Sequence, residues 1–146
     1  MLAHAYDWFK RGEKDLRDAE RLLQNGSYEN AFHLAREGVE LLLKSLLIKQ
    51  GVPEREFIKQ GGIRHDYLKA LQRIDWRKIQ KADRRVIEKA VNSLIHFEME
   101  SGDICCVKQV SLSRYPEKIT KNDAERTIQL AYNIYREVRK EFQGFQ

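Results

Sequence analysis

Residues 28–50 constrain the fold of this chain more than any other segment. Apolar residues cover more than one side of the helix that this segment would form, and no proline interrupts it. A helix with so wide an apolar surface lies either at the centre of a bundle or between its own bundle and a partner chain. Because monomers rarely leave a large apolar patch in water, we expect a homodimer with a two-fold interface.

Other segments repeat apolar residues at steps of three, four and seven, which places them on one helical face. They are residues 3–24, 66–74, 77–100 and 122–142. Asn25-Gly26 should end the first helix, Ser27 should cap the second, and Asn122 with Glu125 should form a capping-box pair on the last. Residues 51–65 are expected to form a polar loop. The pattern predicts an all-α up-and-down bundle of four long helices plus one short helix.

Composition supports one domain over residues 1–146. Of these 146 residues, 42% are hydrophobic and 34% charged, and only two are prolines. No apolar run reaches the ~18–20 residues of a membrane span, and the first residues are charged too early for a secretory signal. We therefore expect a cytoplasmic protein. Cys105 and Cys106 are adjacent, so a disulfide between them would close a strained ring, and we expect reduced packing residues.

The sequence lacks the common catalytic and metal-binding motifs. The four histidines are not spaced as metal ligands, and no phosphate-binding glycine loop or nucleophile elbow is present. We therefore expect no metal and no cofactor. The net charge is +5, and residues 51–90 carry an excess of basic side chains. This basic stretch can face phosphate, or it can be a solvated helix surface.

An ordered set of residues over nearly the whole chain carries a resemblance to a known family. The set comprises Trp8, Lys14-Asp15-Leu16, the stretch NGSYENAF at 25–32, Glu40 with Lys44, His65 after a glycine-containing loop, and Arg114-Tyr115-Pro116 before the last helix. From Tyr6 to Phe142 the chain resembles the HEPN family, named for nucleotide binding in higher eukaryotes and prokaryotes.

The resemblance implies a helical bundle that pairs as a homodimer. It also implies nucleotide binding, or a minimal nucleotidyltransferase partner in a toxin–antitoxin pair. One branch of the family cleaves RNA without metal, using an arginine followed by four to six residues and a histidine. No histidine here has an arginine at that distance. We therefore expect a non-catalytic domain. A divergent ribonuclease toxin and a pure protein-interaction module with no small ligand remain alternatives.

Four residues form the predicted nucleotide site: Lys44, His65, Arg114 and Tyr115. Arg114 lies in an irregular segment, where its guanidinium can clamp a phosphate or pair with an acidic side chain of the preceding helix. Tyr115 offers a ring for a base. Lys44 and His65 converge on Arg114 if the bundle folds as the resemblance implies. Alternatively, Lys44 forms a helix-surface ion pair with Glu40, and His65 braces the short helix.

Overall fold

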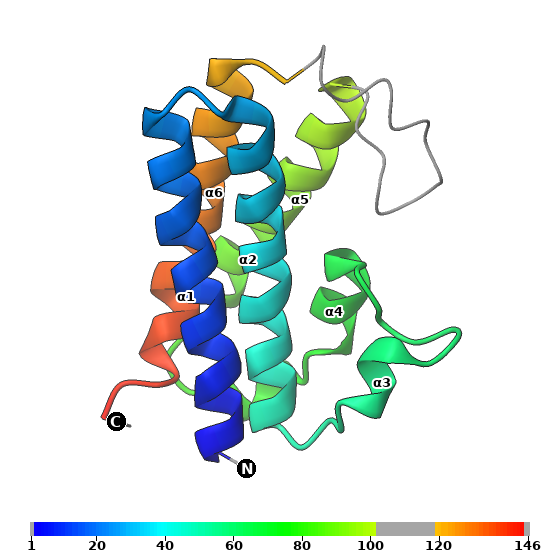
Figure 1. Ribbon diagram of the computed structural model, residues 1–146. Coiled ribbons are helices and arrows are strands. Elements are labelled where there is room, and N and C mark those ends of the chain that lie inside the picture. Colours follow the sequence, from blue (N-terminus) through cyan, green and yellow to red (C-terminus); the bar gives the residue numbers. More distant parts are fainter. Residues whose placement is uncertain (1, 102–118, 145–146) are drawn as a thin grey trace.

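The computed structural model describes residues 2–101 and 119–144, and these residues form helices and no strand. The elements are α1 (Leu2–Gln24), α2 (Tyr28–Lys49), α3 (Arg55–Ile58), α4 (Tyr67–Arg73), the 3₁₀ turn η1 (Trp76–Lys78), α5 (Arg84–Ser101) and α6 (Lys121–Lys140). The long helices α1, α2, α5 and α6 run alternately up and down, while α3 and α4 lie beside one end of α2 (Figure 1). The predicted all-α bundle is confirmed.

Helix α2 is the central helix of the chain. It packs against α1, α6 and α4, and its apolar side chains from Leu41 to Leu47 are buried. Its crossing with α1 is close, because a Cβ on Gly38 would lie 2.7 Å from a methyl carbon of Leu16. The wide apolar surface is therefore covered within one chain. It no longer gives a reason to expect a partner chain on α2, although dimerisation itself stays a prediction.

Helix ends follow the sequence signals only in part. Gly26 has a positive φ of 81° after the last turn of α1, as Asn25-Gly26 predicts. Ser27 precedes α2, but its hydroxyl accepts from the side chain of Asn30 at 2.9 Å and makes no cap bond to the backbone. The capping box of α6 joins Thr120 and Asp123, so the predicted pair of Asn122 and Glu125 was wrong. Thr120 has the extended backbone that a cap requires, with ψ of 172°.

The middle of the chain departs from the expected pattern in two places. The predicted loop 51–65 contains the single helical turn α3, whose Phe57 is buried. The predicted helix 77–100 begins only at Arg84, after η1 and a loop. Asp75 caps η1 by accepting the backbone N–H of Arg77, and this fixes a separate short turn.

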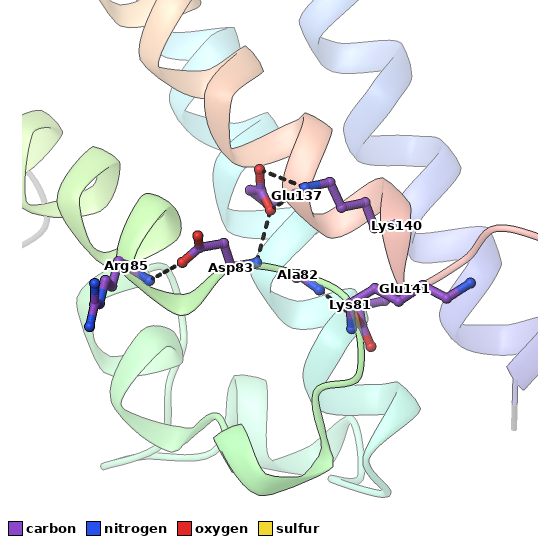
Figure 2. Close-up of polar contacts among 7 residues, drawn as sticks. All are labelled: Lys81, Ala82, Asp83, Arg85, Glu137, Lys140 and Glu141. Atoms are coloured by element: carbon purple, nitrogen blue, oxygen red, sulfur yellow. Dashed lines mark hydrogen bonds and ion pairs between the residues drawn. The ribbon is translucent and has the colours of Figure 1, made fainter.

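Glu137 of α6 and Glu141, the residue just after α6, hold the loop before α5. The side chain of Glu141 is fully buried and accepts backbone N–H groups of Gln80 at 3.2 Å, Lys81 at 2.5 Å and Ala82 at 2.7 Å. Glu137 accepts the N–H of Asp83 at 2.8 Å. Figure 2 shows both carboxylates reaching from the end of α6 to this loop. Burial raises the pKa of Glu141, but the three backbone hydrogen bonds and Lys49 outweigh it and hold that pKa below its usual range.

Candidate functional site

A buried ion pair on α2 forms the base of the candidate site. Lys44 and Glu40 stand one turn apart, and the Lys44 Nζ lies 2.8 Å from the Glu40 Oε2. Both side chains are largely covered, at 5% and 13% exposure. The Lys44 ammonium also donates to the carbonyl oxygen of Arg64 and lies 5.2 Å from the ring centre of Phe57. With these contacts, Lys44 is a bracing group between α2, α3 and the loop before α4.

The loop before α4 is shaped so that its end reaches this pair. The backbone N–H of Ile63 donates to the Glu56 carbonyl at 2.9 Å, and the Ile63 side chain is buried. Arg64 has a φ of +52°, which a non-glycine residue rarely adopts. The hydrogen bond from Lys44 to the Arg64 carbonyl supports this conformation.

His65 is the accessible group of the site. Its side chain is 88% exposed, and its Nδ1 lies 3.1 Å from the Glu40 Oε2. Glu40 therefore joins a covered lysine on one side to an exposed histidine on the other. The neighbouring Arg64 is also exposed. Because Lys44 neutralises Glu40, the outer surface of the site is formed by Arg64 and His65 and can carry positive charge.

The structure thus places two of the four predicted nucleotide-binding residues side by side. Lys44 and His65 meet on Glu40, a residue that the i, i+4 spacing already paired with Lys44. Lys44 is turned inward, so it reaches the surface only through Glu40. Arg114 and Tyr115 lie outside the described residues.

Helix α1 adds an aromatic edge to the same region. The Trp8 ring meets Phe57 edge-on at 5.3 Å, and the Arg11 guanidinium lies 4.8 Å from the centre of the Trp8 ring. The two rings therefore lie between two cations, Arg11 on Trp8 and Lys44 on Phe57. Such cation–π contacts stabilise the docking of α3 and leave an exposed arginine at its rim.

A second polar cluster lies between α1 and α6, and its contact across the two helices has no signal in the sequence. Glu13 is buried, pairs with Lys10 at 2.6 Å and Arg17 at 3.5 Å, and accepts the hydroxyl of Tyr135. Burial raises the pKa of Glu13, but the bonds from Lys10 and Tyr135 and the nearby charges hold it below its usual range. Burial and the bond to Glu13 raise the pKa of Tyr135 to about 12. Glu13 is thus ionised and Tyr135 neutral near neutral pH.

A third cluster is a pair of acids, Asp15 on α1 and Glu37 on α2. Burial, and then the hydrogen bond shared with the Glu37 carboxyl, raise the pKa of Asp15 to about 7. A carboxyl whose pKa is raised by folding binds protons more tightly in the folded chain. The contribution of Asp15 to the free energy of unfolding therefore falls as the pH rises from about 4 to 7.

Replacing Asp15 with asparagine should remove the loss of stability that comes from ionising this buried carboxyl at higher pH. We expect Asp15→Asn to raise the free energy of unfolding at pH 8 by about 1 kcal/mol, a figure reduced for solvent screening of a half-buried group. Near pH 4 the change should be small. Urea denaturation across this pH range measures both values. Asp18→Asn is the control and should show the opposite sign, because a hydrogen bond from Lys14 lowers the pKa of Asp18. If Asp15→Asn and wild type differed in stability by the same amount at every pH, the raised pKa of Asp15 and its hydrogen bond with Glu37 would be contradicted.

An arginine and a histidine also meet on α2. The Arg36 Nη1 lies 3.3 Å from the His33 Nδ1, and Arg36 is 7% exposed. The two residues are spaced i, i+3 with the histidine first, so they do not fit the pattern of an arginine ahead of a histidine.

Within residues 2–101 and 119–144, no three His, Cys, Asp or Glu side chains are grouped to hold a metal ion. In the same ranges no helix combines the length and apolarity that crossing a membrane requires.

Comparison with known proteins gives the family of this chain. The model of the HEPN domain family matches residues 5–89. The crystal structure of an archaeal HEPN homologue is similar to this chain over 95% of its residues and 98% of that protein, with a TM-score of 0.61 and 25% identity. No curated protein matches the sequence. The chain belongs to the HEPN domain family.

Proposed function

We propose that this chain is a non-catalytic HEPN domain that binds a nucleoside phosphate, either alone or held by a nucleotidyltransferase partner. The site is the surface formed by Arg64 and His65, together with Arg114 and Tyr115. The observation that supports it most is the contact of His65 with Glu40, whose charge is neutralised by the buried Lys44. A guanidinium and an imidazole N–H, with the imidazole held by Glu40, are suitable donors to phosphate oxygens.

The proposal predicts a specific loss of affinity. In calorimetric titrations with ATP and GTP, His65→Ala should weaken binding about tenfold or more, the effect of losing one hydrogen bond to a charged group. Arg114→Ala should weaken it to a similar or larger degree. His4→Ala is the matched control, since His4 pairs with Glu54 at 2.7 Å, away from Glu40. No heat with either nucleotide at millimolar concentration would leave the interaction-module alternative.

The partner and the physiological role are also part of the proposal. A homodimer, a nucleotidyltransferase partner and a toxin–antitoxin role are implied by the family. Among the described residues, the exposed large apolar side chains are Leu2, Ile58 and Val86. They lie on three different helices, α1, α3 and α5.

A divergent ribonuclease is the second candidate, and the contact between His33 and Arg36 favours it. RNA cleavage without metal needs a general acid or base. His33 is the partly exposed group of this pair and could act as the acid or base, with the buried Arg36 holding its ring. Cleavage of single-stranded RNA in chelator that is lost on His33→Ala would support this second function over the first.

A further inference from the structure

A pocket between the first half of α1 and the end of α6 lies apart from Glu40 and His65. Its volume is about 330 Å³. It is lined by the charged side chains of Lys10, Glu13, Arg17 and Arg139 and by aromatic rings. We propose that it binds a phosphoryl dianion, either as free phosphate or as a phosphate monoester. This site goes beyond the function proposed above and shares no residue with it.

The charges around the pocket favour an anion. Three cationic side chains, Lys10, Arg17 and Arg139, face one carboxylate, Glu13. The local balance is therefore +2, which a dianion neutralises. The lowered pKa of Glu13 agrees with this balance, because the cations around the pocket stabilise a negative charge in spite of burial.

Glu13 positions the cations without using all their donors. It receives one bond from Lys10 and one from the hydroxyl of Tyr135, and its ion pair with Arg17 is loose at 3.5 Å. The side chains of Lys10 and Arg17 remain 48% and 61% exposed. An ammonium has three N–H donors and a guanidinium five, so both groups retain donors for phosphate oxygens.

Arg139 has no competing partner in the described part of the chain. It is exposed, and no described side chain or backbone group forms a hydrogen bond or an ion pair with its guanidinium. A planar guanidinium on a pocket wall is suited to bidentate contact with phosphate. We therefore assign Arg139 the main contact and Lys10 and Arg17 the supporting ones.

The aromatic residues make the pocket rigid on its inner side. The rings of Phe9 and Phe142 stack at 4.9 Å, and both residues are almost fully buried. The Tyr6 ring stands at 6.0 Å from Phe9 and forms the more open wall. Because the faces of Phe9 and Phe142 are covered, the pocket offers little apolar surface to a ligand. Charge on the ligand, more than an attached ring, should determine affinity.

The test is a calorimetric titration with inorganic phosphate and with ribose 5-phosphate at constant ionic strength. Wild type should bind at least one of them, and Arg139→Gln should weaken binding at least tenfold. Arg136→Gln is the matched control, because Arg136 is an exposed arginine of the same helix that does not line the pocket. It should change affinity less than twofold. Circular dichroism should show both variants folded.

The two ligands separate the sources of the phosphoryl group. Similar affinities for the two ligands would show that free phosphate is sufficient for binding. Tighter binding of ribose 5-phosphate would identify a phosphate ester as the preferred ligand. No binding of either ligand by wild type would overturn the proposal, as would equal losses in Arg139→Gln and Arg136→Gln. The phosphate loss is measured on Arg139→Gln and the nucleotide loss on His65→Ala, so each site is tested by its own variant. Failure of this site and failure of the nucleotide site are therefore distinguishable.

Discussion

Replacing Glu141 with alanine is expected to lower the free energy of unfolding by about 3–5 kcal/mol. The Glu141 carboxylate is fully buried and accepts three consecutive backbone N–H groups, from Gln80 to Ala82. Each N–H left without an acceptor costs about 1–3 kcal/mol, and rearrangement of the loop recovers part of the sum. Urea denaturation followed by circular dichroism measures the difference.

Glu125→Ala is the control for this substitution. Glu125 lies on α6, the helix that ends just before Glu141, but it is exposed, so its removal should change stability by less than about 0.5 kcal/mol. Glu141→Gln keeps one acceptor oxygen and should fall between the two. Because the folded pKa of Glu141 is lowered from its ordinary value of 4.5, its contribution is complete only when the pH is well above 4.5 and is lost as the pH falls through the folded pKa. Equal stability of Glu141→Ala and wild type would show that the loop does not depend on this carboxylate.

The same contacts explain where the sequence pattern failed. Ile79 continues the apolar spacing of α5 backward, so periodicity alone extends that helix to residue 77. In the fold, Glu137 and Glu141 bind the N–H groups of residues 80–83, and these contacts hold that stretch as a loop. The two glutamates follow this loop by more than fifty positions in the chain, so no local spacing of residues predicts the contact. The long helices were predictable because their apolar spacing is a local property.

As with the fold, only the local contacts of the candidate site could be predicted from the sequence. The i, i+4 spacing of Glu40 and Lys44 is visible in the sequence, whereas the approach of His65 depends on the loop conformation at Arg64. Glu13 and Tyr135 are 122 positions apart, and their contact depends on the packing of α6 against α1. Clusters of this kind are created by the tertiary fold, so the local spacing of residues could not predict them.

Lys44→Met is expected to lower the free energy of unfolding by about 3 kcal/mol. Methionine fills a similar volume, but it leaves the buried Glu40 carboxylate without its ammonium partner and removes the donor to the Arg64 carbonyl. Loss of one partner from a buried ion pair typically costs about 3–5 kcal/mol. The double variant Glu40→Leu/Lys44→Met removes both charges, so most of that stability should return. Thermal and urea denaturation of the two variants give the comparison.

Nucleotide titration of the same two variants separates a bracing lysine from a binding one. If Lys44 acts through Glu40, the double variant is stable but leaves His65 without its carboxylate, and its affinity should resemble that of His65→Ala. If Lys44 itself contacts phosphate, Lys44→Met should lose affinity with little loss of stability. The 5% exposure of the Lys44 side chain and its contacts with Glu40 and Arg64 favour the first outcome. A stable Lys44→Met variant that no longer binds nucleotide would therefore reverse the assignment of Lys44 as a support for the exposed histidine.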